Sequence, residues 1–256
     1  MFHRDSVLPA VLTYYESGKK MSMMWCADGE RSRENGLPAY VEYYENGQEK
    51  DQIWYINNNI IILVEIMVFP PDYHIMKMVT KNSKNGSKMT ENIGKMIKPA
   101  SIQYYENGRI MIEKWLEHGI RQRKHALPSY IQYYKNGRIM IEKWFHDDEY
   151  YRENELPAYV EYYENGMEKE NTWYINNKRD RENDLPASVK YYPNGNIMKK
   201  VWFKNGVPSR NENLPTIVKY YENGNIMREQ WIQDHMRHRE GNQPADIKYY
   251  KNGKKT

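Results

Sequence analysis

Cysteines, phenylalanines and long apolar segments are scarce in this chain of 256 residues. Its one cysteine, Cys26, excludes a framework of internal disulfides. The longest apolar run, Ile60 to Phe69, contains Glu65 and falls well short of the roughly 20 residues that a membrane-spanning helix needs. The first residues form no apolar signal region. We therefore expect an intracellular protein without a signal peptide or transmembrane segment, cytoplasmic or, if viral, in the host cytoplasm or the virion.

A large excess of charge of one sign is also missing. The chain has 38 basic and 34 acidic residues and a net charge of +4. Such a balance gives no strong attraction to nucleic acid or to anionic lipid. We therefore expect no nucleic-acid partner, and we keep a membrane surface only as an alternative to a protein partner.

A 29-residue repeat fills most of the chain, and its clearest copy is Leu185 to Trp202. The prolines of successive copies mark the period: Pro9 and Pro38, then Pro99, Pro128, Pro157, Pro186, Pro215 and Pro244. Arrays of this kind stack one unit on the next around a thin continuous core. The spacing predicts a single array over residues 1–256, with about nine units of which the first and last are partial.

Each unit has the sequence pattern of a β-hairpin. After Pro186, Ala187 and Val189 alternate with polar positions, which is typical of a half-buried strand. Asn194-Gly195 follows, and we expect a two-residue type I′ turn because Asn and Gly tolerate positive φ best. The return strand ends at Trp202, in the position that a tryptophan holds in seven units.

A second turn follows each tryptophan, and the chain then runs through an Arg-Glu-Asn-x-Leu-Pro corner. Two reversals per unit restore the starting direction. The predicted fold is all-β: an elongated antiparallel β-meander, or hairpin repeat array, in a single twisted sheet.

One unit, at about 56–98, is degenerate. Leu63 stands where the proline belongs, and Thr80 replaces the tryptophan. We expect a strand pair that still joins the sheet, followed by a lysine-rich loop. The loop lysines are Lys81, Lys84, Lys88, Lys95 and Lys98. They either contact anionic lipid or nucleic acid, or lie in solvent.

The pattern Pro-Ala-x-Val-x-Tyr-Tyr-x-Asn-Gly, followed by Trp and a second turn, resembles the variant MORN (membrane occupation and recognition nexus) repeat. Arrays of this 29-residue repeat are similar to those of giant DNA viruses and of bacterial antitoxin-like proteins. The resemblance implies an elongated antiparallel sheet used for protein contacts or scaffolding, and it brings no catalytic motif.

Three recurring side chains are candidates for an interaction surface. The second tyrosine of each pair falls on the polar face by alternation, and Tyr is enriched at interfaces. These tyrosines are Tyr105, Tyr134, Tyr163, Tyr192 and Tyr221. An arginine row of Arg123, Arg152, Arg181 and Arg210 would fit an acidic partner. The structural alternatives are a solvated tyrosine edge and arginines that pair with a neighbouring Glu or cap a corner carbonyl. The tryptophans either pack on Tyr and Met of the next unit or form a ligand-stacking ladder.

Catalytic groups are not concentrated anywhere. The histidines fall at unrelated repeat positions, and only His235 and His238 are close in sequence, without further metal ligands nearby. Cys26 lacks an activating base and takes a position that is apolar in other units. We therefore predict no enzyme, no metal and no cofactor. The chain is expected to be a protein-interaction or scaffold module, with a membrane-surface module or an antitoxin-like sequestering protein as alternatives, and end-to-end self-association is a further expectation.

Overall fold

The computed structural model describes residues 8–55 and 99–255, apart from 28, 34–36, 118, 125, 211–212 and 234. Between 56 and 98 it describes only the backbone of three strands. All elements of the described residues are strands, which confirms the all-β prediction. None of these residues belongs to a helix able to cross a membrane. The chain forms two compact units, Met1–Ile120 and Arg121–Thr256.

Six long strands form an antiparallel meander in the first unit, in the order of the chain. They are β1 (Val11–Tyr14), β2 (Lys20–Met24), β5 (Tyr40–Tyr43), β6 (Glu49–Ile53), β10 (Ser101–Tyr104) and β11 (Ile110–Lys114). Short strands follow the hairpins: β3 (Cys26–Ala27) pairs with β4 (Glu30–Arg31), and β12 (Leu116–Glu117) ends the unit. The chain passes to the second unit within β13 (Ile120–Arg121).

The degenerate repeat does not join this meander, so that prediction was wrong. Strands β7 (Ile61–Val64), β8 (Met76–Thr80) and β9 (Gly94–Lys95) form a separate three-stranded sheet. Strand β6 pairs directly with β10 instead, with Ile53 opposite Ser101. The regular repeats on either side thus pair with each other and leave the degenerate segment out. Of the loop lysines, Lys95 belongs to β9, and Lys81, Lys84, Lys88 and Lys98 lie outside the described residues.

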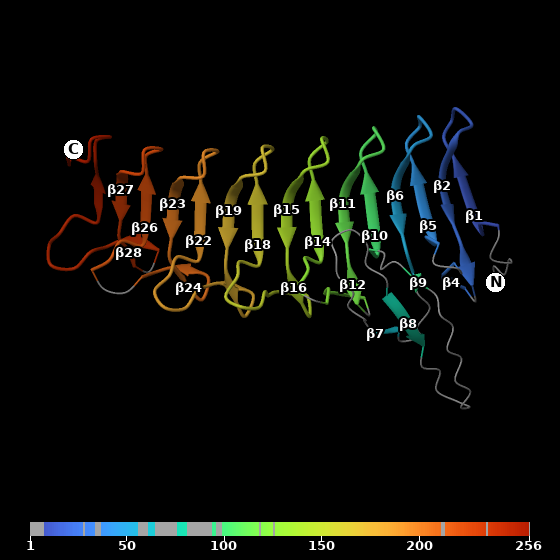
Figure 1. Cartoon of the computed structure of the whole chain (residues 1–256), viewed down its shortest axis with the longest axis horizontal. Coiled ribbons are helices and arrows are strands. Elements are labelled where there is room, and N and C mark those ends of the chain that lie inside the picture. Colours follow the sequence, from blue (N-terminus) through green and yellow to red (C-terminus); the bar gives the residue numbers. More distant parts are fainter. Residues whose placement is uncertain are drawn as a thin grey trace. The chain divides into compact units, whose positions relative to one another are not determined.

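Nine long strands form the meander of the second unit, again in the order of the chain (Figure 1). They are β14 (Tyr130–Tyr133), β15 (Ile139–Lys143), β18 (Tyr159–Tyr162), β19 (Glu168–Thr172), β22 (Ser188–Tyr191), β23 (Ile197–Val201), β26 (Ile217–Tyr220), β27 (Ile226–Gln230) and β30 (Asp246–Lys248). Two reversals per repeat are therefore confirmed.

The second reversal is a small hairpin, whose turn the sequence predicts but whose two short strands it does not. Four such hairpins lie at one end of the long strands of the second unit (Figure 1). They are β16 (Phe145–His146) with β17 (Glu149–Tyr150), β20 (Tyr174–Ile175) with β21 (Lys178–Arg179), β24 (Phe203–Lys204) with β25 (Val207–Pro208), and β28 (Ile232–Gln233) with β29 (Met236–Arg237). Each carries the chain from a tryptophan toward the next corner.

The long hairpins do not close with type I′ turns, which corrects the predicted turn type. At Gly166 the amide donates to Tyr163 O over 2.8 Å, and φ is +91° at the glycine but not positive at Asn165. This is a type I turn over Glu164-Asn165 followed by a left-handed glycine, and the strands shift register beside it. Type I′ turns occur instead in the small hairpins, where Asn176 and Asn177 have φ of 49° and 59°.

The core is thin and lies at the strand ends nearest the corners. The first and third residues after five of the corner prolines are buried, as in Ala158 (1% exposed) and Val160 (3%), and those after Pro9, Pro99 and Pro244 are half-buried. Trp144 packs on both, with Tyr150, Tyr162 and Tyr174 around them. The tryptophan of one repeat thus covers the small residues of the next, which confirms the structural interpretation of the tryptophans, with Ala and Val as partners.

Candidate interaction surface

The second tyrosine of each pair joins one repeat to the next. In the second unit the hydroxyls of Tyr134, Tyr163, Tyr192 and Tyr221 each donate to the carbonyl of the first tyrosine of the following pair, over 2.8 Å. Tyr15 and Tyr44 make the same bond in the first unit. Tyr105 closes its turn through its amide, which donates to Arg109 O over 2.8 Å. The hydroxyls thus have a structural role, while the half-buried rings still reach the surface.

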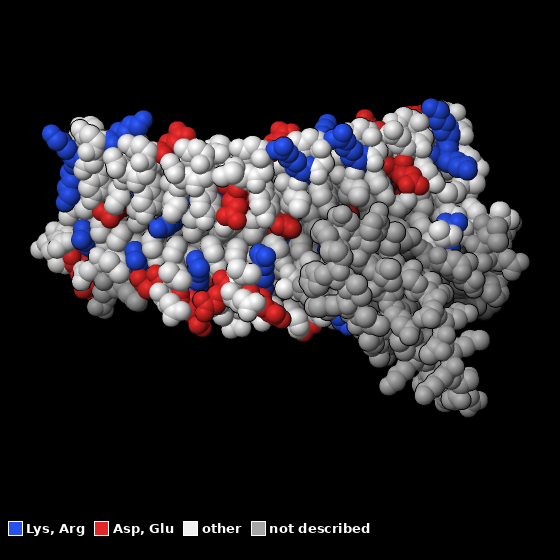
Figure 2. All heavy atoms as spheres, viewed as in Figure 1, with Lys and Arg blue, Asp and Glu red and all other residues white. Residues whose placement is uncertain are grey.

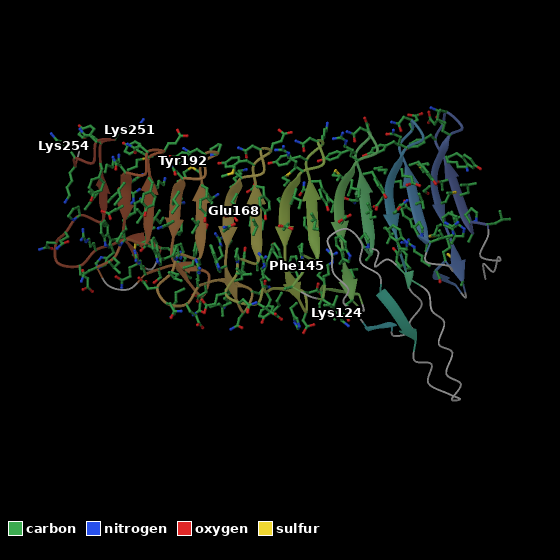
Figure 3. The ribbon with its side chains drawn as sticks, viewed as in Figure 1. Lys124, Phe145, Glu168, Tyr192, Lys251 and Lys254 are labelled. Atoms are coloured by element: carbon green, nitrogen blue, oxygen red, sulfur yellow. The ribbon has the colours of Figure 1, made fainter. Side chains whose placement is uncertain are left out.

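These tyrosines share a face with the fourth residue after the proline. The Lys169 ammonium lies 2.6 Å from the Glu161 carboxylate and 5.8 Å from the centre of the Tyr163 ring. Lys50 makes the equivalent contacts with Glu42 and Tyr44. The predicted alternation of faces therefore holds up to the turn. Figure 3 places Tyr192 toward the turn end of its hairpin.

The recurring arginine stacks on the tryptophan of its own repeat. The guanidinium carbon lies 3.6 to 3.8 Å from the indole centre in five described repeats. These pairs are Arg33 on Trp25, Arg152 on Trp144, Arg181 on Trp173, Arg210 on Trp202 and Arg239 on Trp231. Burial lowers the pKa of Arg152 and of Arg181, although both stay charged at neutral pH.

The same arginines cap the carbonyl of the corner proline. Arg152 Nη1 donates to Pro157 O over 3.2 Å, and Arg123 and Arg210 reach Pro128 O and Pro215 O over the same distance. This confirms the carbonyl-capping alternative for the arginine row. Arg210 is distinct because it also pairs with Asp184 of the preceding corner, at 3.0 Å. Figure 2 shows basic and acidic groups mixed along this border of the second unit.

The tryptophans fix the corner from the other side. Trp144, Trp173 and Trp202 donate their indole N–H over 2.8 Å to carbonyls of the preceding corner. Those carbonyls belong to Ala126, Glu155 and Asp184, which have φ between 51° and 54°. Side-chain bonding therefore holds a left-handed backbone that non-glycine residues seldom adopt.

An aromatic and arginine ladder runs along the small hairpins. Arg121 lies 4.2 Å from the Phe145 ring centre, Phe145 lies 4.5 Å from Tyr150, and Tyr150 stacks on Tyr174 at 4.3 Å. Further along, Arg179 lies 4.6 Å from the Phe203 ring. The rings contact one another or a guanidinium, so the ladder ties neighbouring hairpins together.

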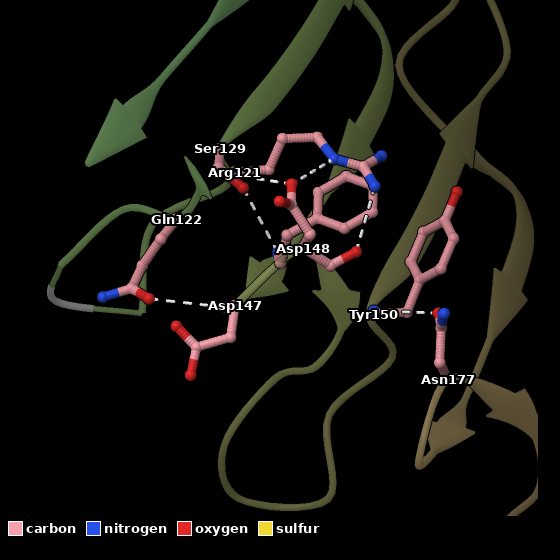
Figure 4. Close-up of polar contacts among 8 residues, drawn as sticks. Arg121, Gln122, Ser129, Asp147, Asp148, Tyr150 and Asn177 are labelled. Atoms are coloured by element: carbon pink, nitrogen blue, oxygen red, sulfur yellow. Dashed lines mark hydrogen bonds and ion pairs between the residues drawn. The ribbon is translucent and has the colours of Figure 1, made fainter. Parts of the chain in front are cut away.

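Polar bonds hold the same hairpins in place (Figure 4). Arg121 donates to Asp148 through its Nε over 2.8 Å and through its own amide over 2.9 Å. The Tyr150 amide donates to Asn177 Oδ1 of the next hairpin over 3.2 Å. These turn residues thus stabilise neighbouring hairpins.

An exposed leucine precedes six of the corner prolines, and no surface role was predicted for it from the sequence. In the second unit Leu127, Leu156, Leu185 and Leu214 are 38 to 46% exposed. Leu8 and Leu37 take the same position in the first unit, at 60% and 43%. The sequence does contain a signal for this surface: a large apolar residue recurs at the corner, outside the alternating pattern of the strand.

Among the described residues, no group of three His, Cys, Asp or Glu side chains is arranged to hold a metal ion. Cys26 is a free, half-buried thiol at the start of β3, opposite Arg31. The arrangement is therefore a repetitive surface of leucines, tyrosine rings and charges.

Comparison with known proteins agrees with the repeat pattern. Residues 188–205 match the family described as the MORN repeat variant. The matched segment spans β22, β23, Trp202 and β24, which is the long hairpin and the first strand of the small one. The resemblance predicted from the sequence is thus supported for that repeat. No curated protein matches the chain.

Proposed function

We propose that the chain is a non-catalytic repeat protein that binds a protein partner through the leucines at its corners. The observation that carries this proposal is their exposure: four leucines at one repeat position of the second unit are each more than a third exposed. Apolar side chains gathered on a surface mark interaction sites.

The other recurring side chains have structural partners, which supports the choice of the leucines. The arginines are stacked and capped, the tyrosine hydroxyls bond to the next repeat, and the tryptophans lie in the core. Successive leucines are two strands apart, which places them about 10 Å from one another. A partner that contacts several leucines would gain a similar increment from each repeat.

Gradual loss of binding is the expected result when the leucines are changed. We would identify the partner by affinity purification and mass spectrometry and then measure its affinity with purified components. Leu156→Glu and Leu185→Glu should each weaken binding about tenfold, or about 1.4 kcal/mol, because a charge replaces a buried apolar contact.

Met167→Glu is the matched control. Met167 is 45% exposed but lies beside the turn of its long hairpin, away from the corners. It should leave the affinity unchanged. Complete loss of binding from one leucine change, or an equal effect of Met167→Glu, would contradict the proposal.

The membrane-surface and antitoxin-like alternatives stay hypotheses. The first depends on the lysine-rich loop, most of which lies outside the described residues. The second depends on one tight partner, and the affinity purification above would reveal such a partner directly.

A further inference from the structure

Five cations lie in one register row across five neighbouring strands of the second unit. The strands are β22, β23, β26, β27 and β30. The directly opposed pairs are Lys190 with Lys199, Lys199 with Lys219, Lys219 with Arg228, and Arg228 with Lys248. Because each residue lies on the next strand and neighbouring strands are about 4.8 Å apart, the row is about 19 Å long.

Carboxylates neutralise only part of this row. Glu170 lies 2.8 Å from Lys190, and Asp246 forms an ion pair with Arg228. Within the described part of the chain, no carboxylate forms an ion pair with Lys199 or Lys219. Burial, followed by the neighbouring Lys219 and Lys190, lowers the pKa of Lys199, and the nearby Glu170 carboxylate offsets only part of this shift.

The fold does not require cations at these positions. Earlier strands of the same unit carry Gln132, Ile141, Glu161 and Glu170 in the equivalent row. Like charges directly opposite one another destabilise a sheet. Glu161 and Glu170 form one like-charged pair in that row, whereas the cations form four consecutive ones, and local departures of this kind concentrate at functional sites.

The row is one residue wide and has tyrosines beside it. The next residues on the same face toward the corners are Ser188, Val201, Ile217, Gln230 and Asp246. Toward the turns, Tyr192 and Tyr221 lie two residues beyond Lys190 and Lys219. In the preceding repeat the equivalent residues are Glu161 and Tyr163. Lys169 contacts both the Glu161 carboxylate and the Tyr163 ring, so the two positions lie on one face. A single file of cations beside aromatic rings therefore crosses the strands.

We propose that this row binds the phosphate backbone of a single-stranded nucleic acid, with bases lying against the tyrosine rings. Cations that follow a backbone beside aromatic rings are the usual means of binding single strands. A protein partner fits less well because Lys is depleted at protein interfaces. A bilayer presents charge in two dimensions, whereas this row is linear. The nearly balanced net charge led us to expect no nucleic-acid partner. Net charge hides this row because acidic side chains on earlier strands offset its positive charge.

The experiment uses the full chain and a fluorescent oligothymidylate of about 20 nucleotides. Fluorescence anisotropy measures the affinity of the protein for this oligonucleotide at several salt concentrations. Binding should weaken with salt, and Lys199→Gln with Lys219→Gln should reduce the slope of log K against log salt by about 1.4, since each phosphate contact contributes about 0.7. The double variant should melt at the wild-type temperature or about 2–4 °C above it, because like-charge repulsion is relieved.

Lys200→Gln is the matched control. Lys200 neighbours Lys199 on β23, but its ammonium lies 5.6 Å from the Tyr220 ring on the opposite face. It removes one lysine charge from the same strand and should leave the slope unchanged. The proposal is overturned if the oligonucleotide fails to bind at low salt or if Lys200→Gln reduces the slope by about 0.7, as the loss of one phosphate contact would. Displacement by polyglutamate at equal charge concentration would also overturn it and would favour an acidic protein partner.

Discussion

At the scale of single residues, the corner arginine makes two structural contacts at once. Its guanidinium lies flat on an indole ring and also donates to a carbonyl, as Arg152 does with Trp144 and Pro157. A planar guanidinium can stack through its face and donate from its edge at the same time, whereas the compact ammonium of lysine cannot. The residue type at this position thus follows from geometry as well as from charge.

Arg152→Lys should therefore destabilise the protein although it preserves the charge. We expect a loss of about 1–2 kcal/mol, the sum of a partly desolvated cation–π contact and one hydrogen bond to a charged donor. Denaturant unfolding monitored by tryptophan fluorescence measures the change. Arg138→Lys should cost at most a few tenths of a kcal/mol, because this exposed guanidinium stacks on no tryptophan and its bond to Glu164 O over 3.2 Å lies in solvent. Equal effects of the two changes would argue against a structural role for the stack.

At the scale of elements, two turns with similar sequences have different geometries. Asn165-Gly166 ends a type I turn with a bulge, and Asn205-Gly206 forms a type I′ turn with φ of 50° and 85°. The difference lies in the flanking pairing: Tyr162 opposes Glu168 after a register shift, whereas Lys204 opposes Val207 across the two turn residues. Loop length thus decides the turn type, and the dipeptide alone does not.

Gly166→Ala should cost about 1 kcal/mol or slightly more. The glycine has φ of +91°, and a Cβ atom there would meet no neighbour within 4 Å, so the cost comes from backbone conformation alone. Asn176→Gly is the contrasting change because that residue already has φ of 49°. It should be neutral within a few tenths of a kcal/mol. Chemical denaturation measures both, and a neutral Gly166→Ala would contradict the bulged turn.

Strands, reversals and buried tryptophans could be predicted because they depend on local patterns. The alternation around Val189 and the asparagine-glycine pairs contain that information in a few residues. The turns of the small hairpins were predicted, but their strands were missed because two-residue strands such as Phe203–Lys204 are too short to show a period. The cation row was missed because its members lie in separate repeats and meet only when the register between strands is known.

At the scale of the whole molecule, each repeat mainly contacts the next one. The tyrosine hydroxyl bonds join residues 28 positions apart, as in Tyr163 with Tyr191. Across the degenerate segment the same bond joins Tyr44 to Tyr104, 60 positions apart. The Trp54 amide likewise donates to Ala100 O over 2.9 Å, as Trp144 does to Ala158 O. The contact between neighbouring repeats is thus preserved when the intervening chain is longer.

Removal of the degenerate segment should therefore leave the fold intact. The residues Trp54 to Asn58 have the same sequence as Trp173 to Asn177, so residues 59–98 can be replaced by a copy of residues 178–185. The separation of 46 positions between Trp54 and Ala100 then falls to the 14 that separate Trp144 from Ala158. A shorter closed loop should stabilise this junction by about 1 kcal/mol. Denaturant unfolding measures the stability, and amide hydrogen exchange at Trp54 should show unchanged or stronger protection. Loss of protection there would mean that the segment itself supports the pairing of β6 with β10.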